Sequence, residues 1–126
     1  MTRSWLAPST TRTMSVSDAA WLAGFFDGEG SICSSMAGRN RKHPTWILAI
    51  PNTHLAPLDH CVAITGAGKI YKKYAATQKW SAQWTWQVQR QRNIASILEQ
   101  IRPYLVTKRG KADEFLSQWS DVKTAA

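Results

Sequence analysis

Two acidic residues close together, Asp27 and Glu29, are the side chains of this 126-residue chain best suited to chemistry. They end the stretch WLAGFFDGEGSI, which begins at Trp21 as an amphipathic helix. The C-terminus of a helix carries partial negative charge, so two carboxylates are unfavourable there unless a cation lies nearby. Carboxylate oxygens are hard ligands that suit Mg²⁺. The pair therefore predicts a divalent-metal site at the end of this helix.

A calcium loop of the EF-hand type is the rival interpretation, because DGEGSI resembles the centre of such a loop. Counted outward from that centre, the first ligand position falls on Phe25 and the last on Met36. Neither side chain can bind calcium, so this class of site is excluded.

The helix that precedes the acids carries a stripe of small residues, Ala20, Gly24 and Gly28, spaced four apart. Each interior glycine costs roughly 0.8–1 kcal/mol relative to alanine. Close approach of a second helix would offset that cost, and the chain holds no second copy of the stripe. We expect the same helix of another subunit to pack here around a two-fold axis, with Trp21 and Phe25 in the interface. The alternative is a glycine cap at Gly28 and chance at Gly24.

Positive charge is concentrated in the middle of the chain. The net charge is +8, and residues 30–98 hold nine basic residues against one acid, Asp59. The remaining residues carry seven bases and seven acids. Such segregation is typical of a surface that binds a polyanion, and the alternative is a solvated basic surface on an unrelated enzyme.

Hydrophobic periodicity predicts two hairpins alternating with helices. Helices are expected over about 18–28, 54–64, 93–101 and 111–122, and strands over 31–36, 45–51, 69–75 and 80–89. Ser15 or Ser17 would cap the first helix, and the glycine-rich residues 65–68 would end the second. This order predicts an α+β fold with the helices on one face of the sheet. Residues 1–16 have no periodicity and are expected to form a flexible leader, followed by one domain over 17–122 and a tail over 123–126.

The stretch WSAQWTWQVQ, residues 80–89, alternates between apolar even and polar odd positions. A strand with period two buries one side and exposes the other, so Trp84 and Trp86 are expected in the core. The exposed amides and hydroxyls would suit contacts with base edges, since glutamine pairs well with adenine. The alternative is a face that only confers solubility.

The sequence resembles the LAGLIDADG homing endonucleases. The resemblance rests on residues 22–30, LAGFFDGEG, with Ser31-Ile32 after them, Gly66-Ala-Gly68 before the third strand, and PYLVTK at 103–108. It implies an αββαββα fold with a four-stranded antiparallel, saddle-shaped sheet. It also implies a homodimer that meets through the signature helices and cuts both strands of a long, nearly palindromic DNA site. Members of the family are commonly encoded within introns.

The resemblance also implies roles for individual residues. Glu29, together with the backbone carbonyl of Gly28, matches the metal-binding position, where aspartate is commoner in the family. Asp27 matches an acid that is more structural than metal-binding. Lys108 matches a lysine near the scissile phosphate, and Asn52 matches a position, often glutamine, that orders water. The implied cofactor is Mg²⁺, with Mn²⁺ or Ca²⁺ as structural substitutes.

The open side of the sheet and its basic hairpins are the expected DNA-binding surface. Its members are Ser31, Cys33, Ser35, Arg39, Arg41, Lys42, Thr45, Lys69, Tyr71, Lys73, Gln83, Thr85, Gln87, Gln89, Arg90 and Arg92.

These features together predict a metal-dependent, site-specific DNA endonuclease. A maturase that binds intron RNA, or a regulator that binds DNA without cutting it, is the rival class. We expect no membrane association, because no apolar run approaches the length of a bilayer span. Neither a signal peptide nor a secreted disulfide pattern is evident, which favours the cytoplasm, or the matrix of an organelle that encodes the gene.

Overall fold

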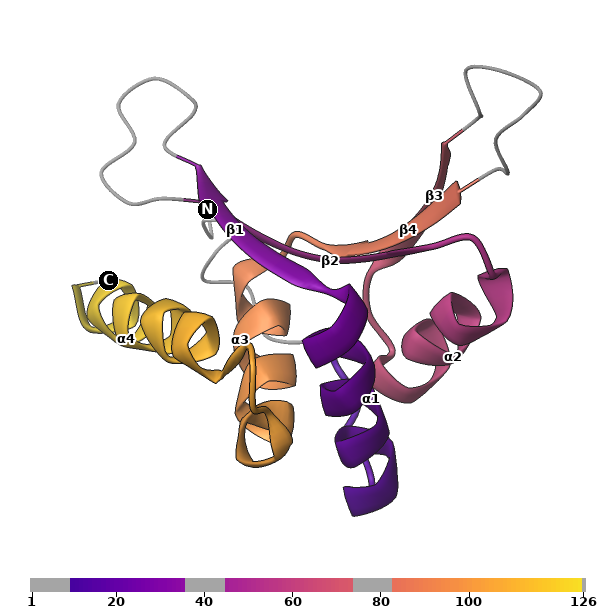
Figure 1. Ribbon diagram of the computed structural model, residues 1–126. Coiled ribbons are helices and arrows are strands. Elements are labelled where there is room, and N and C mark those ends of the chain that lie inside the picture. Colours follow the sequence, from indigo (N-terminus) through magenta and orange to yellow (C-terminus); the bar gives the residue numbers. More distant parts are fainter. Residues whose placement is uncertain (1–9, 36–44, 74–82, 126) are drawn as a thin grey trace.

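The computed structural model describes residues 10–35, 45–73 and 83–125 of the chain. Its helices and strands follow the predicted order (Figure 1). They are α1 (Val16–Glu29), β1 (Ser31–Ser35), β2 (Thr45–Asn52), α2 (Leu55–Thr65), β3 (Lys69–Lys73), β4 (Gln83–Val88), α3 (Gln91–Ile101), the 3₁₀ turn η2 (Arg102–Tyr104) and α4 (Arg109–Ala125). Within these residues no helix is both long enough and apolar enough for a bilayer span.

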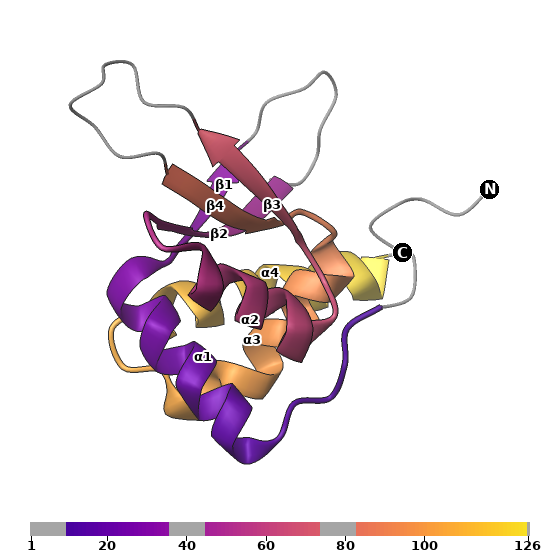
Figure 2. The ribbon, with the colours of Figure 1, turned by 90° about the vertical axis from the view of Figure 1, so that its right-hand side faces the viewer.

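The four strands form one antiparallel sheet in the order β1-β2-β4-β3. The two central strands come from different hairpins and join through pairs such as Ile50 with Trp86. All the helices cover one face of this curved sheet, and the concave face is left open (Figures 1 and 2). The α+β fold with helices on one face is thus confirmed.

The core lies between the sheet and the helices. Even-numbered side chains of β2 and β4, among them Leu48, Ile50 and Trp86, are fully buried in one cluster with Phe26 of α1. Trp84, expected in the core, is only half-buried. It pairs with the last residue of β2 and with a lysine of β3, near the start of β4, where the sheet curves away from the helices (Figure 1).

Helix α1 is fixed at both ends by local interactions. The Ser15 hydroxyl oxygen accepts a hydrogen bond from the Asp18 amide at 3.1 Å, which is the capping role predicted for Ser15. At the other end Gly30 follows the helix because there is no room for a side chain. A methyl group there would lie 2.1 Å from a ring carbon of Phe26. The final glycine of the signature therefore allows Phe26 to close the core beneath the start of β1.

Part of the expected leader is held against the helices. The Thr10 amide donates to the Asn93 side chain at 2.9 Å, and the Met14 amide donates to the Gln100 side chain at 2.7 Å. The Arg12 amide donates to the carbonyl of Thr65 at 2.7 Å. Residues 10–15 of the leader expected for 1–16 therefore run along α2 and α3, whereas residues 1–9 lie outside the described part of the chain. These contacts involve backbone groups and polar side chains distant in sequence, which leave no periodic pattern.

The turn between α2 and β3 contains two glycines with positive φ, Gly66 at 68° and Gly68 at 88°. Gly66 is the left-handed cap of α2, as predicted from the sequence. Beside Gly68, a methyl group would lie 2.4 Å from Nε1 of Trp86 and 2.8 Å from the carbonyl oxygen of Gln87. That Nε1 also donates to the Ala67 carbonyl at 3.0 Å, so the indole has no freedom to move aside.

Replacing Gly68 with alanine is expected to lower the free energy of unfolding by about 2–4 kcal/mol, through backbone strain and overpacking together. Gly66→Ala is the matched control, because the three atoms nearest its methyl would all belong to the flexible side chain of Arg12. Its expected loss is about 1–2 kcal/mol, the strain alone. Urea unfolding measures both, and equal losses would show that the contact with Trp86 does not matter.

Candidate functional site

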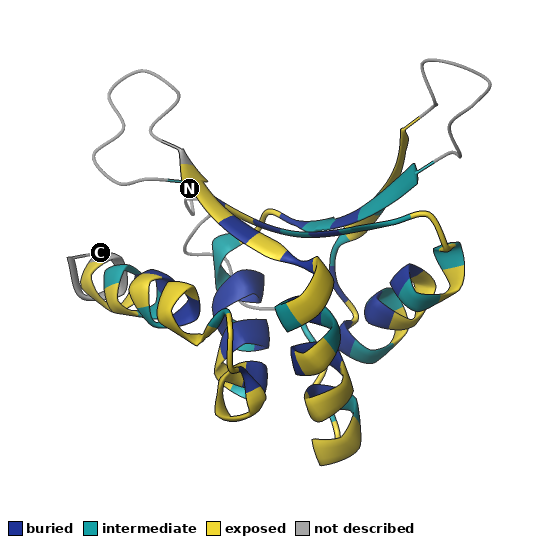
Figure 3. Cartoon of the chain, viewed as in Figure 1, coloured by how far each residue is buried: buried dark blue, intermediate teal, exposed yellow. Residues whose placement is uncertain are grey.

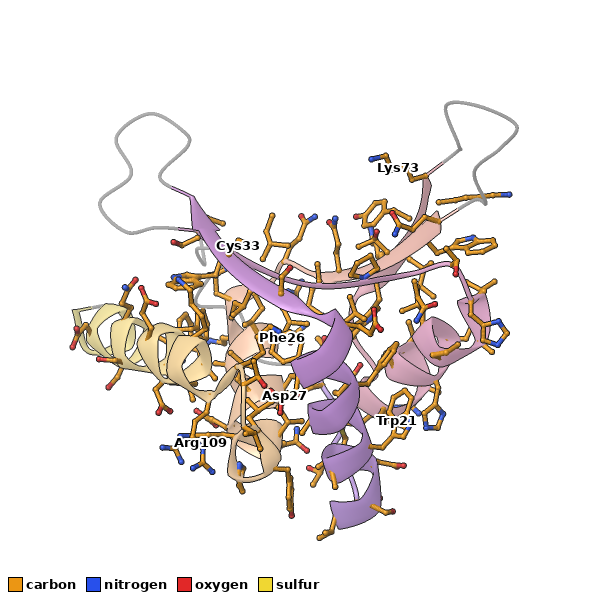
Figure 4. The ribbon with its side chains drawn as sticks, viewed as in Figure 1. Trp21, Phe26, Asp27, Cys33, Lys73 and Arg109 are labelled. Atoms are coloured by element: carbon orange, nitrogen blue, oxygen red, sulfur yellow. The ribbon has the colours of Figure 1, made fainter. Side chains whose placement is uncertain are left out.

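The open face of the sheet carries rows of side chains from all four strands. One row runs Ser31, Ala49, Gln87 and Lys69, as the strand pairing sets it. The neighbouring rows place Thr85 beside Tyr71, Gln83 beside Lys73, and Cys33 beside Ile47. Because side chains alternate along a strand, all of these lie opposite the buried even-numbered residues. The sheet therefore presents a concave surface that is mainly polar and basic, with Lys73 on the side away from the helices (Figure 4).

Most of the DNA-contact residues predicted on strands share this face. Ser35 pairs with Thr45 on the outer part of the same hairpin. Gln89 and Arg90 lie exposed just after β4, where Nε2 of the Gln89 side chain donates to Oε1 of Gln87 at 3.0 Å. The predicted hairpin contacts Arg39, Arg41 and Lys42 lie outside the described residues.

Arg92 does not join the open face. It lies in the first turn of α3, and its guanidinium sits 5.6 Å from the ring centre of Trp119 on α4. Its Nε is buried and has no hydrogen-bond partner among the described residues. The start of α3 turns this side chain toward the helical layer, and a contact of Arg92 with a DNA phosphate stays a prediction.

The end of α1 is joined to the chain that leads into α4. The two carboxylate oxygens of Asp27 accept hydrogen bonds from the backbone amides of Val106, at 2.7 Å, and Lys108, at 2.8 Å. In return, Nζ of Lys108 donates to the Asp27 carbonyl at 3.0 Å. Both oxygens of the Asp27 carboxylate (Figure 4) are thus used within the fold, and Lys108 places a cation at the C-terminus of α1.

Further contacts hold the connecting segment that carries Lys108. Arg102 of η2 forms an ion pair with Asp113 of α4. The hydrogen bond from Arg102 lowers the pKa of the Asp113 carboxyl, and the same bond raises the pKa of Arg102. Arg109 donates to the carbonyls of Arg102, at 3.4 Å, and Pro103, at 3.2 Å. Leu105 anchors the segment in the core. Lys108 therefore lies on a fixed segment at the C-terminal end of α1.

Glu29, two residues after Asp27, has a different environment. It is the last residue of α1, it is exposed, and among the described residues its carboxylate makes no hydrogen bond or ion pair. The Gly28 carbonyl belongs to the last turn, where carbonyls lack partners within the helix. Within the described residues of one chain, no three His, Cys, Asp or Glu side chains come together as a metal site. The two acids of the signature thus separate into one that stabilises the fold and one that is free.

Asn52, the third predicted catalytic residue, ends β2. Its Oδ1 accepts a hydrogen bond from the His54 amide at 2.8 Å, which turns the chain into α2. The carbonyl half of the amide is therefore used in the fold, and the NH₂ half is the part that can face a ligand.

The small-residue stripe of α1 faces outward. Ala20, Gly24 and Gly28 are exposed, along a side of α1 that no other element covers (Figure 3). A methyl group added at Gly24 or Gly28 would meet nothing within 4 Å. Beside the stripe, Trp21 packs edge-on against His60 of α2, with ring centres 4.7 Å apart, and lies 5.2 Å from the ring of Phe25. Packing among the described residues thus explains neither glycine.

Solved structures resemble this arrangement over most of the chain. The homing endonuclease I-CvuI, in complex with its target in the presence of calcium, is 25% identical with a TM-score of 0.69, covering 81% of this chain and 65% of that one. The archaeal intron-encoded homing endonuclease I-Vdi141I, complexed with DNA, is 16% identical with a TM-score of 0.68, covering 84% and 69%. The chain has the LAGLIDADG homing endonuclease fold.

This fold confirms the resemblance seen in residues 22–30. The meganuclease I-SmaMI, bound to an uncleavable DNA, shares the fold at 18% identity and a TM-score of 0.70. The match covers 85% of this chain but only 37% of I-SmaMI. The chain spans about two thirds of the length of I-CvuI. No protein-family model matches the sequence, and a search of curated proteins also finds no match.

Proposed function

We propose that this protein is a homodimeric, divalent-metal-dependent homing endonuclease that cuts both strands of a long, nearly palindromic DNA site. The observation that carries the proposal is the difference between the environments of Asp27 and Glu29 at the C-terminal end of α1. Asp27 is fully used in holding the fold, whereas Glu29, beside it, is exposed and free to act. A second, unpaired carboxylate is unfavourable at a helix C-terminus, which carries partial negative charge, so the fold alone does not explain Glu29.

Glu29 and Gly28 suit a hard divalent cation. A carboxylate and a backbone carbonyl are the oxygen ligands that Mg²⁺ and Ca²⁺ accept, with Mn²⁺ as a further substitute. Phosphate oxygens of the DNA and the same residues of the second subunit would complete the ligand set. A bound Mg²⁺ supplies positive charge that stabilises the transition state of phosphodiester hydrolysis.

Lys108 and Asn52 would assist from the protein. The ammonium of Lys108 is held at the C-terminal end of α1 by the carbonyl of Asp27, a residue two positions before Glu29. There it would neutralise charge that develops on the phosphate oxygens. The NH₂ group of Asn52 would hold a water molecule or a phosphate oxygen, while its carbonyl stays bound to the backbone.

The open face would bind the major groove of the DNA. Exposed lysines on β3, Lys69 and Lys73, would neutralise phosphates, and Gln83, Thr85 and Gln87 would face base edges. The basic hairpin that contains Arg39, Arg41 and Lys42 would extend this surface along the DNA.

A second copy of the chain would cover the stripe on α1. Two-fold packing at Ala20, Gly24 and Gly28 would place the two copies of Glu29 near each other, one for each DNA strand. We also propose that the gene lies within an intron, and that the protein acts in the cytoplasm or in the matrix of an organelle.

The test begins with a pool of random-sequence DNA duplexes, selected for binding in Ca²⁺. The selected duplex is then placed in a plasmid and incubated with the protein in Mg²⁺. A double-strand cut within the selected sequence supports the proposal. Specific binding without a cut would favour the DNA-binding regulator, and preferential binding of structured intron RNA would favour the maturase.

A further inference from the structure

Strand β2 is apolar on both faces from Trp46 to Pro51. Its even-numbered side chains, among them Leu48 and Ile50, are buried beneath the sheet. Its open side carries Ile47, Ala49 and Pro51. A sheet with one solvated face normally shows polar residues on that face, so the central strand departs from the expected alternation.

Ile47 is the most exposed of these three apolar side chains. It is 37% exposed and lies directly opposite Cys33, which is also exposed, on the edge strand. Ala49 and Pro51 continue this apolar strip along β2, and the positions beside it on β4 and β3, such as Gln87 and Lys69, are polar or basic. Ile47 is therefore the most exposed point of a narrow apolar strip, in a surface otherwise suited to hydrogen bonds and phosphates.

Its ligand must offer an apolar group within a polar, negatively charged surface. In the major groove of DNA the 5-methyl group of thymine is the one such group on a base edge. The methyl groups of Ile47 cannot hydrogen-bond, so they gain nothing from the other base edges. Double-stranded RNA does not fit, because its major groove is too narrow for side chains.

We propose that Ile47 is a specificity-determining residue that contacts a thymine methyl group in each half of the DNA site. The proposal rests on the proposed function, in which the open face lies in the major groove. The two-fold axis of the homodimer makes the contact occur twice, once per half-site. Ile47 thereby distinguishes a T·A pair from a C·G pair by burial of a methyl group.

Deoxyuridine scanning tests this contact. Each thymine of the selected duplex is replaced in turn by deoxyuridine, in both half-sites together, which removes the methyl group and keeps the base pairing. At one position per half-site the wild-type dissociation constant should rise about fourfold per methyl, or about 15-fold for the pair. Ile47→Ala should bind the thymine and deoxyuridine duplexes equally at that position.

Val106→Ala is the matched control, because Val106 is an 82% exposed β-branched residue away from the open face. It should keep the full deoxyuridine effect, and circular dichroism should show that both variants are folded. A duplex insensitive to deoxyuridine would overturn the proposal, and so would an effect that survives in Ile47→Ala. Failure to select any duplex would instead reject the proposed function, and the contact with it.

Discussion

Replacing Glu29 with glutamine is expected to slow DNA cleavage by about 10³-fold or more, while DNA affinity stays within about twofold. Glutamine keeps the size of the side chain and removes the charge that would hold a divalent cation. Because Glu29 makes no contact within the described residues, its loss leaves the fold intact. The measurement is single-turnover cleavage of the selected duplex in Mg²⁺, alongside binding of the same duplex in Ca²⁺.

Asp59→Asn is the matched control for the Glu29 variant. Asp59 is also an exposed carboxylate on a helix, but it lies on α2. Its replacement makes the same change in net charge and should leave the cleavage rate unchanged. Cleavage by Glu29→Gln at the wild-type rate would remove Glu29 from the metal site. A parallel loss of DNA affinity would instead mean that Glu29 supports the complex as a whole.

The sequence predicts the regular elements well because each depends on local periodicity. Trp86 alternates with polar neighbours, and the structure buries it completely. Ser15 and Gly66 sit at helix ends for reasons that depend on a few adjacent residues, and both take the expected roles. The resemblance in residues 22–30 adds the location of the candidate site, because it fixes where Asp27 and Glu29 fall at the end of α1.

Other features could not be predicted because they depend on contacts between distant segments. The partners of Asp27 are the backbone amides of Val106 and Lys108, which look the same for any sequence. The turn of α3 directs Arg92 to Trp119, although composition alone groups this arginine with the basic surface. The exposure of Ile47 could not be predicted, because the run WILAIP is apolar at both odd and even positions and shows no alternation.

Replacing Gly24 with leucine should have opposite effects on the subunit and on the dimer. In the single chain there is nothing within 4 Å of a methyl group at this position, so a side chain fits. Removing a glycine from the interior of a helix should stabilise the folded subunit by roughly 0.5–1 kcal/mol. Between two helices in backbone contact, however, a leucine would push the subunits apart. The variant is therefore expected to be a folded monomer that does not cut both strands.

Gly110→Leu separates the two effects, because Gly110 also lies in a helix with open space around it, on α4 rather than on the stripe. It should remain a dimer of normal mass by analytical ultracentrifugation, whereas Gly24→Leu should sediment as a monomer at the same concentration. Circular dichroism then establishes that each variant is folded. A Gly24→Leu dimer of undiminished stability would mean that α1 does not form the interface. In that case the exposed glycines would need another partner, and the two copies of Glu29 would not meet at one DNA site.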